Sequence, residues 1–74
     1  MDARVERPRW DRRHHHAWGG LEVLLQAHPE GVPGIEALDR ILEYGLDEQE
    51  GILLFETLRD REMIVVSGGR WRLA

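Results

Sequence analysis

Two adjacent glycines near the C-terminus, Gly68 and Gly69, separate two short apolar segments, residues 63–66 and 70–73. Adjacent glycines supply the positive φ angles of a tight turn, so this stretch predicts a β-hairpin. Side chains alternate between the two faces of a hairpin, so the turn also sets the strand register. It pairs Val66 with Trp71 and Ile64 with Leu73, and we expect these four side chains to share the face that closes a core. The opposite face carries Val65, Arg70 and Arg72.

The middle of the chain predicts two helices joined by a turn or short extended piece, "EGVPG". Apolar residues with helical spacing precede Pro29, at Trp18, Leu21, Leu24, Leu25 and His28. Because Gly19 and Gly20 weaken a first helical turn, we expect this helix to begin near Leu21. Pro33 is well placed to open the second helix, whose apolar face comprises Ile35, Leu38, Ile41 and Leu42.

A third helix is predicted immediately after a short turn. Asp47 and Glu50 have the spacing of a capping box, in which each side chain bonds the other residue's backbone N–H. The buried stripe is expected to hold Ile52, Phe55 and Leu58, with Leu54 at its edge. Gly51 lies inside this helix and costs it about 1 kcal/mol relative to alanine, so tertiary contacts must support the helix there.

The order of these elements is that of a winged helix-turn-helix. The stretches "LEVLLQAHPEGVPGIEALDRIL" and "LLFETLRDREMIVVSGGRWRL" carry the likeness, and residues 18–73 resemble the small winged-helix modules of MarR-like and IclR-like bacterial transcription regulators. The resemblance implies an α+β fold, a three-helix winged helix-turn-helix with a C-terminal two-stranded β-hairpin wing. It also implies that the third helix would lie in a DNA major groove while the wing touches the adjacent backbone.

The charge distribution divides the chain into two parts. Residues 1–16 hold five arginines against three acids, and the remainder holds five arginines against eleven acids. We therefore expect residues 1–16 to be a flexible basic N-terminal arm and residues 17–74 to be the winged-helix-like domain. The chain contains no lysine, so every cation is a guanidinium suited to planar, bidentate contacts.

Length and composition argue against several classes of protein. A chain of 74 residues buries too little surface for a deep catalytic cleft, and it has no cysteine for a disulfide or a thiolate zinc site. No apolar run is long enough to span a membrane, and the N-terminus lacks the apolar stretch of a secretory signal. We expect a cytoplasmic protein that is not an enzyme and has no cofactor, no membrane partner and no small-molecule substrate.

The third helix has the wrong charge for reading DNA. Residues 47–62 contain six acids and only two arginines, and a face dominated by acids is repelled by phosphates. Its outward positions are predicted to be Glu48, Gln49, Leu53, Glu56 and Asp60. This pattern favours a protein-interaction surface, for an adaptor in a transcription or replication-type assembly or for self-association, and a dimer is one form this could take.

The alternative is a DNA- or RNA-binding regulator that uses its arginines. The candidate nucleic-acid contacts lie in the arm and the wing, and they are Arg7, Arg9, Trp10, Arg12, Arg13, Arg70 and Arg72. The arm could also be a plain solvated tail, or its arginines could dock on an acidic protein surface, on the body of this chain or on a second copy. In a body this acidic, pairing of the wing arginines with Asp60, Glu62 or another neighbouring acid is favoured over a phosphate contact.

The remaining chemically versatile residues predict no site. His14, His15 and His16 are adjacent on the expected arm, and no second cluster completes a tetrahedral metal site. Ser67 is the single serine, and it sits in a turn rather than a nucleophile elbow. We therefore predict neither a metal site nor catalytic residues.

Overall fold

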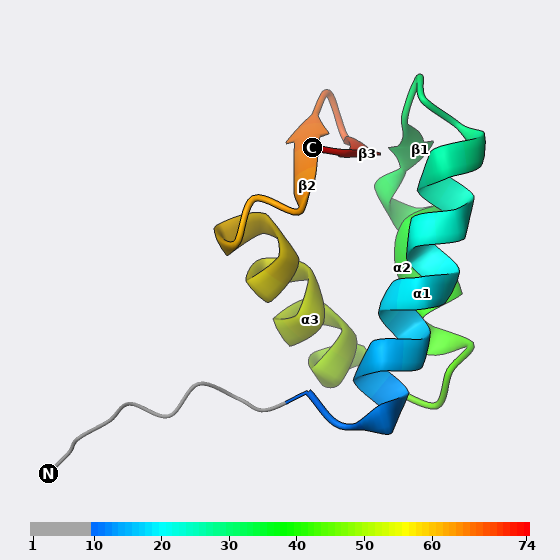
Figure 1. Cartoon of the computed structure of the whole chain (residues 1–74), viewed down its shortest axis with the longest axis vertical. Helices are drawn as coiled ribbons and strands as arrows, with labels where there is room; N and C mark the ends of the chain where they lie inside the picture. The colour runs from blue at the N-terminus through cyan, green and yellow to red at the C-terminus, as the bar shows by residue number, and fades with distance from the viewer. Residues whose placement is uncertain (1–9) are drawn as a thin grey trace, which may run out of the picture.

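The computed structural model describes residues 10–74, which form an α+β fold of three helices and a three-stranded antiparallel sheet (Figure 1). The elements in chain order are α1 (Arg12–Ala27), β1 (Val32–Pro33), α2 (Gly34–Leu42), α3 (Glu48–Asp60), β2 (Ile64–Ser67) and β3 (Arg70–Leu73). Helices α1 and α2 pack against each other, and the sheet lies at one end of the helices. In the described part of the chain, no helix is both long enough and apolar enough to cross a membrane.

Helix α1 begins earlier than the sequence predicts, at Arg12 rather than near Leu21. Asp11 caps it in a reciprocal capping box with His14, which stands where glutamate or glutamine is usual. This cap offsets the weak helix propensity of Gly19 and Gly20, which lie well inside the helix. Residues 12–16, assigned to the flexible arm, are thus helical, while residues 1–9 of that arm lie outside the described residues.

The predicted hairpin register is confirmed. Val66 pairs with Trp71 and Ile64 pairs with Leu73, across a turn in which Gly68 and Gly69 have φ angles of 61° and 76°. The hairpin is not a two-stranded element, however, because β1 also pairs with β3 and gives the strand order β1-β3-β2. The short extended piece before α2 is therefore part of the sheet, and β3 is its central strand.

The hydrophobic core draws on all three helices and all three strands. Its buried members are Ala17, Leu21, Leu25, Val32, Ala37, Ile41, Leu46, Leu54, Leu58, Ile64 and Trp71. Three residues predicted for the core are exposed instead: Ile35 at 73%, Ile52 at 44%, and Val66 of the hairpin at 36%. Leu54, predicted at the edge of the α3 stripe, is instead fully buried.

The close approach of α2 and α3 at Gly51 explains this difference. A Cβ atom on Gly51 would lie 3.0 Å from Leu42 Cδ2 and 3.2 Å from Leu38 Cδ1, so the two helices meet directly at this glycine. The buried face of α3 consequently runs through Gly51, Leu54 and Leu58, and Ile52 lies to one side of it. The tertiary support that Gly51 requires is provided by α2.

Candidate interaction surface

The outward face of α3 carries the residues that the sequence places there. Glu48, Gln49, Leu53, Glu56 and Asp60 are all exposed. Leu53 is 52% exposed, and the next residue, Ile52, which the sequence assigned to the core, is 44% exposed on the side of α3 that faces α2. A single surface leucine means little, but an exposed leucine and an exposed isoleucine at consecutive positions give this acidic helix apolar side chains on two of its sides.

Ile52 belongs to a groove that continues from α3 onto α2 and the sheet. The groove has a volume of about 410 Å³, and its lining is Gly34, Ile35, Leu38, Ile52, Phe55 and Trp71. These residues come from the start of α2, the middle of α3 and the central strand β3. We refer to them as the apolar groove.

Aromatic stacking forms one wall of the apolar groove. The rings of Phe55 and Trp71 stack with centroids 4.5 Å apart and planes 24° from parallel, which fixes the side of α3 against β3. The guanidinium carbon of Arg59 lies 5.1 Å from the Phe55 ring centroid, within reach of a cation–π contact. Gly34 packs directly against this wall, since a Cβ there would lie 3.0 Å from Trp71 Nε1.

Acidic side chains border the apolar groove. Glu48 and Glu56 each lie one helical turn from Ile52, and Asp39 lies one turn from Ile35. All three carboxylates are exposed. The surface that the groove offers is therefore apolar at its centre and mainly negative at its edge, with Arg59 as a cation beside Phe55.

A smaller pocket lies on the other side of α3. It has a volume of about 190 Å³ and is lined by Trp10, His14, Glu50, Leu53, Leu54 and Thr57. The Trp10 and His15 rings meet edge to face, with their centroids 5.4 Å apart. The Arg61 guanidinium carbon lies 5.7 Å from the centroid of the Trp10 ring. Trp10, a predicted nucleic-acid contact, thus packs beside α3 and Leu53.

The arginines proposed for nucleic acid are not brought together. Arg13 donates hydrogen bonds to Glu50, Asp11 and the Gly45 carbonyl, as expected if arm arginines dock on the body of the chain. Arg70 donates to the Gly31 carbonyl over 3.0 Å. Within residues 10–74, neither Arg70 nor Arg72 forms the ion pair with Asp60 or Glu62 that we considered. Arg7 and Arg9 lie outside the described residues.

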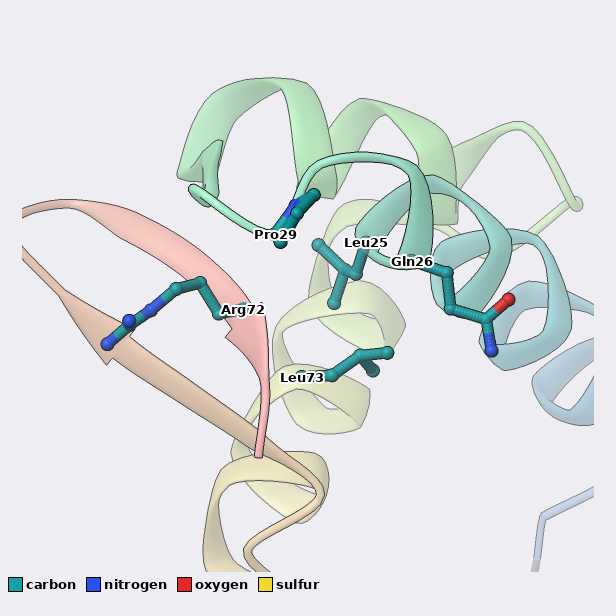
Figure 2. Close-up of a pocket in the computed structure, with 5 residues that line it drawn as sticks. All are labelled: Leu25, Gln26, Pro29, Arg72 and Leu73. Carbon is teal, nitrogen blue, oxygen red and sulfur yellow. The ribbon is translucent and has the colours of Figure 1, made fainter.

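Arg72 borders a third pocket, between the end of α1 and β3. The pocket has a volume of about 340 Å³ and is lined by Leu25, Gln26, Pro29, Arg72 and Leu73. Figure 2 shows the Arg72 side chain extending away from Leu25 and Leu73, so its charge faces outward. One guanidinium, one amide and three apolar side chains provide no nucleophile and no acid–base pair.

The first residue of the histidine tract, His14, takes part in the N-terminal cap of α1. His14 Nδ1 lies 2.7 Å from Asp11 Oδ1 and 3.3 Å from the Asp11 backbone N, and one ring nitrogen can donate or accept but not both. The tautomer with a proton on Nδ1 donates to the Asp11 carboxylate, and the other tautomer accepts the Asp11 backbone N–H of the capping box. Across the described residues, no group of three or more His, Asp or Glu side chains is arranged to hold a metal ion.

Comparison with known proteins gave no match: no protein-family model fits the chain, and no curated protein or solved structure is significantly similar to it. The functional interpretation therefore rests on the residues themselves. Helical spacing alone placed Ile35 and Ile52 in the core, so neither was predicted to lie on the surface. Gly51 was the available signal, since a glycine among bulky residues on a helix marks a close approach that rotates the buried face.

Proposed function

We propose that this chain is a non-catalytic winged-helix interaction module that binds a protein partner, or a second copy of itself, through the outward face of α3. One observation carries the proposal. Ile52 and Leu53 are adjacent and about half exposed on a helix whose other outward residues are mainly acidic. Exposed apolar side chains surrounded by charged ones are typical of protein-interaction surfaces.

The winged-helix assignment is part of the proposal. It is supported by the order of three helices followed by a hairpin, and by a three-stranded sheet in which β1 lies beside the hairpin. In winged helices that read DNA, the helix at the position of α3 enters the major groove. Here residues 47–62 carry six acids and two arginines, so phosphates would repel that helix. The fold is compatible with many functions, and the charge of α3 favours protein binding.

Fewer arginines are free to bind nucleic acid than the sequence predicts. Arg12 and Arg72 are exposed and, within residues 10–74, form no side-chain hydrogen bond. Arg13 and Arg70 are already engaged with groups of this chain. An arginine that holds an internal acceptor is less able to bind a phosphate as well.

A paired binding experiment tests the proposal. The purified protein is titrated with short duplex DNA and single-stranded RNA at several salt concentrations, and immobilised protein is used to capture partners from the cells that produce it. We expect weak or absent nucleic-acid binding, and a captured protein or self-association that Leu53→Glu removes. Val23→Glu on α1 is the matched control, since Val23 is 63% exposed and lies away from α3.

Two other results would contradict the proposal. Tight nucleic-acid binding that weakens steeply with salt, and that is lost in Arg72→Ala combined with deletion of residues 1–9, would establish the alternative. Deletion of residues 1–16 is unsuitable, because it would remove Asp11 and the first turn of α1. Retention of all partner binding and self-association by Leu53→Glu would show that the outward face of α3 is not the contact.

A further inference from the structure

We propose that the apolar groove binds one amphipathic helix of a partner protein, with apolar side chains on its inner face and arginine or lysine at its flanks. This inference rests on the proposed protein-binding function and names the partner's chemistry. It concerns the side of α3 that faces α2, which is distinct from the Leu53 side. Three independent properties of the groove lead to it.

The first property is an exposed aliphatic side chain that the core does not use. Ile35 is 73% exposed, which makes it the most exposed large apolar side chain in the described residues. With Leu38, Ile52, Phe55 and Trp71 it lines one continuous hollow. A hollow of about 410 Å³ lies within the size range of ordinary binding pockets. Covering these side chains would bury apolar surface that folding leaves in water.

The second property is the lack of a free strand edge in the groove. Trp71 is the sheet residue that lines it, and Trp71 pairs with Val32 on one side and Val66 on the other. An extended peptide therefore finds no backbone to pair with at this position. Of the other lining residues, Leu38, Ile52 and Phe55 lie inside helices α2 and α3, where the backbone N–H groups are bonded within the helix, and Gly34 donates its N–H to the Gly69 carbonyl. A helix satisfies its own backbone and can present apolar side chains at i, i+3, i+4 and i+7, so it is the element that fits.

The third property is charge, which selects the partner. Asp39, Glu48 and Glu56 each lie one helical turn from a groove residue and outnumber the single cation beside Phe55, Arg59, and the whole chain has a formal net charge of −4. A second copy docked groove to groove would place like charges opposite each other, which disfavours self-association through this face. A partner helix with cationic flanks would place opposite charges there instead. The occupant is therefore a basic amphipathic helix rather than a second copy.

Two synthetic peptides of matched apolar content test the inference. Each is a capped helical peptide of about 15 residues with leucines at i, i+3, i+4 and i+7, carrying arginine at the flanking positions in one and glutamate in the other. Binding to the full chain is measured by calorimetry, and the contact is mapped by amide chemical shifts. We expect the arginine peptide to bind, with shifts at Ile35, Leu38 and Ile52. The glutamate peptide should bind at least about tenfold more weakly at low salt.

Matched variants locate the contact. Ile35→Asp and Ile52→Asp should each weaken the arginine peptide by about tenfold or more, and Val23→Asp should leave it unchanged. Because Ile35, Ile52 and Val23 are all exposed, circular dichroism should show the three variants equally folded. Glu48→Arg combined with Glu56→Arg should shift the preference toward the glutamate peptide.

Three results would overturn the inference: no binding of the arginine peptide, equal binding of both peptides, or shifts that fall outside the groove. A dimer that Ile35→Asp dissociates would show that a second copy is the occupant. Failure here is distinguishable from failure of the proposed function. If a captured partner is lost with Leu53→Glu but kept with Ile35→Asp, the protein-binding function stands and the groove is not its site.

Discussion

Arg13 donates a hydrogen bond from Nη2 to Glu50 Oε2 over 2.9 Å, linking the first turn of α1 to the first turn of α3. The same guanidinium donates to the Gly45 carbonyl over 3.2 Å, in the turn between α2 and α3. Glu50 in turn accepts the Asp47 backbone N–H over 3.0 Å in the capping box of α3. The hydrogen bond that Arg13 donates to Glu50, followed by the one it donates to Asp11, raises the pKa of Arg13. One side chain thus joins the first turns of α1 and α3 to the turn that connects α2 with α3.

This network predicts an order of stability among three variants. Arg13→Ala should lower the midpoint of urea unfolding, because it removes the bonds to Glu50 and to the Gly45 carbonyl. Glu50→Ala should lower it further, because it also opens the capping box of α3. Arg12→Ala is the control, since Arg12 is exposed and in the same helical turn. Equal midpoints for Arg12→Ala and Arg13→Ala would show that the link between the helices contributes nothing measurable.

The two adjacent leucines of α3 should respond very differently to truncation. Leu54 is 2% exposed and Leu53 is 52% exposed, so only Leu54→Ala creates a cavity in the core. We expect Leu54→Ala to lower the free energy of unfolding by about 2–5 kcal/mol, and Leu53→Ala by less than about 1 kcal/mol. Chemical denaturation measures both. The reverse order would mean that α3 is rotated about its axis, with Ile52 in the core as its spacing alone predicted.

The glycine pair of α1 offers a second matched comparison. Gly19→Ala should raise the free energy of unfolding by about 0.5–1 kcal/mol, because alanine is the better helix former and nothing lies within 4 Å of the added Cβ. Gly20→Ala should lose this gain, because its Cβ would collide with the Tyr44 ring and force that ring to move. Thermal melts of the two variants test the difference. If the variants are equally stable, the Tyr44 ring does not pack on Gly20.

The cap of α1 should make the free energy of unfolding depend on pH in the acidic range. The backbone N–H of His14, followed by its side chain and by Arg13, lowers the pKa of Asp11 from its ordinary value of 3.8 to about 2. A carboxyl whose pKa is lower in the folded state stabilises the fold above its unfolded pKa. This contribution is lost as the pH falls through the folded value, so the decline should lie between about pH 4 and pH 2.

Asp11→Asn isolates this effect, because asparagine still accepts the His14 N–H but cannot titrate. Urea midpoints of the variant should fall less steeply than those of the natural chain between pH 4 and pH 2. Asp60→Asn controls for the loss of one negative charge, since Asp60 accepts no side-chain hydrogen bond within residues 10–74. Parallel acid profiles for the natural chain and Asp11→Asn would contradict the assignment of this cap.

Local sequence determined the features that depend on neighbours a few positions apart. Gly68 and Gly69 with alternating apolar residues were enough to predict the register of β2 against β3, which the structure confirms. The spacing of Asp47 and Glu50 predicted the capping box that begins α3. The start of α1 was missed although its signal is also local, because histidine replaces the glutamate expected three residues after the Asp11 cap.

Contacts between distant segments decided the rest. Gly51 lets α2 approach α3, which turns Leu54 inward and leaves Ile35 and Ile52 exposed along the apolar groove. Helical spacing predicts an apolar stripe, but it does not fix the rotation of the helix about its own axis. That rotation depends on which neighbouring element packs closest, and it decides which side chains are buried. Similarly, the sequence shows that Arg13 and Glu50 have opposite charges, and only the tertiary structure places them 2.9 Å apart.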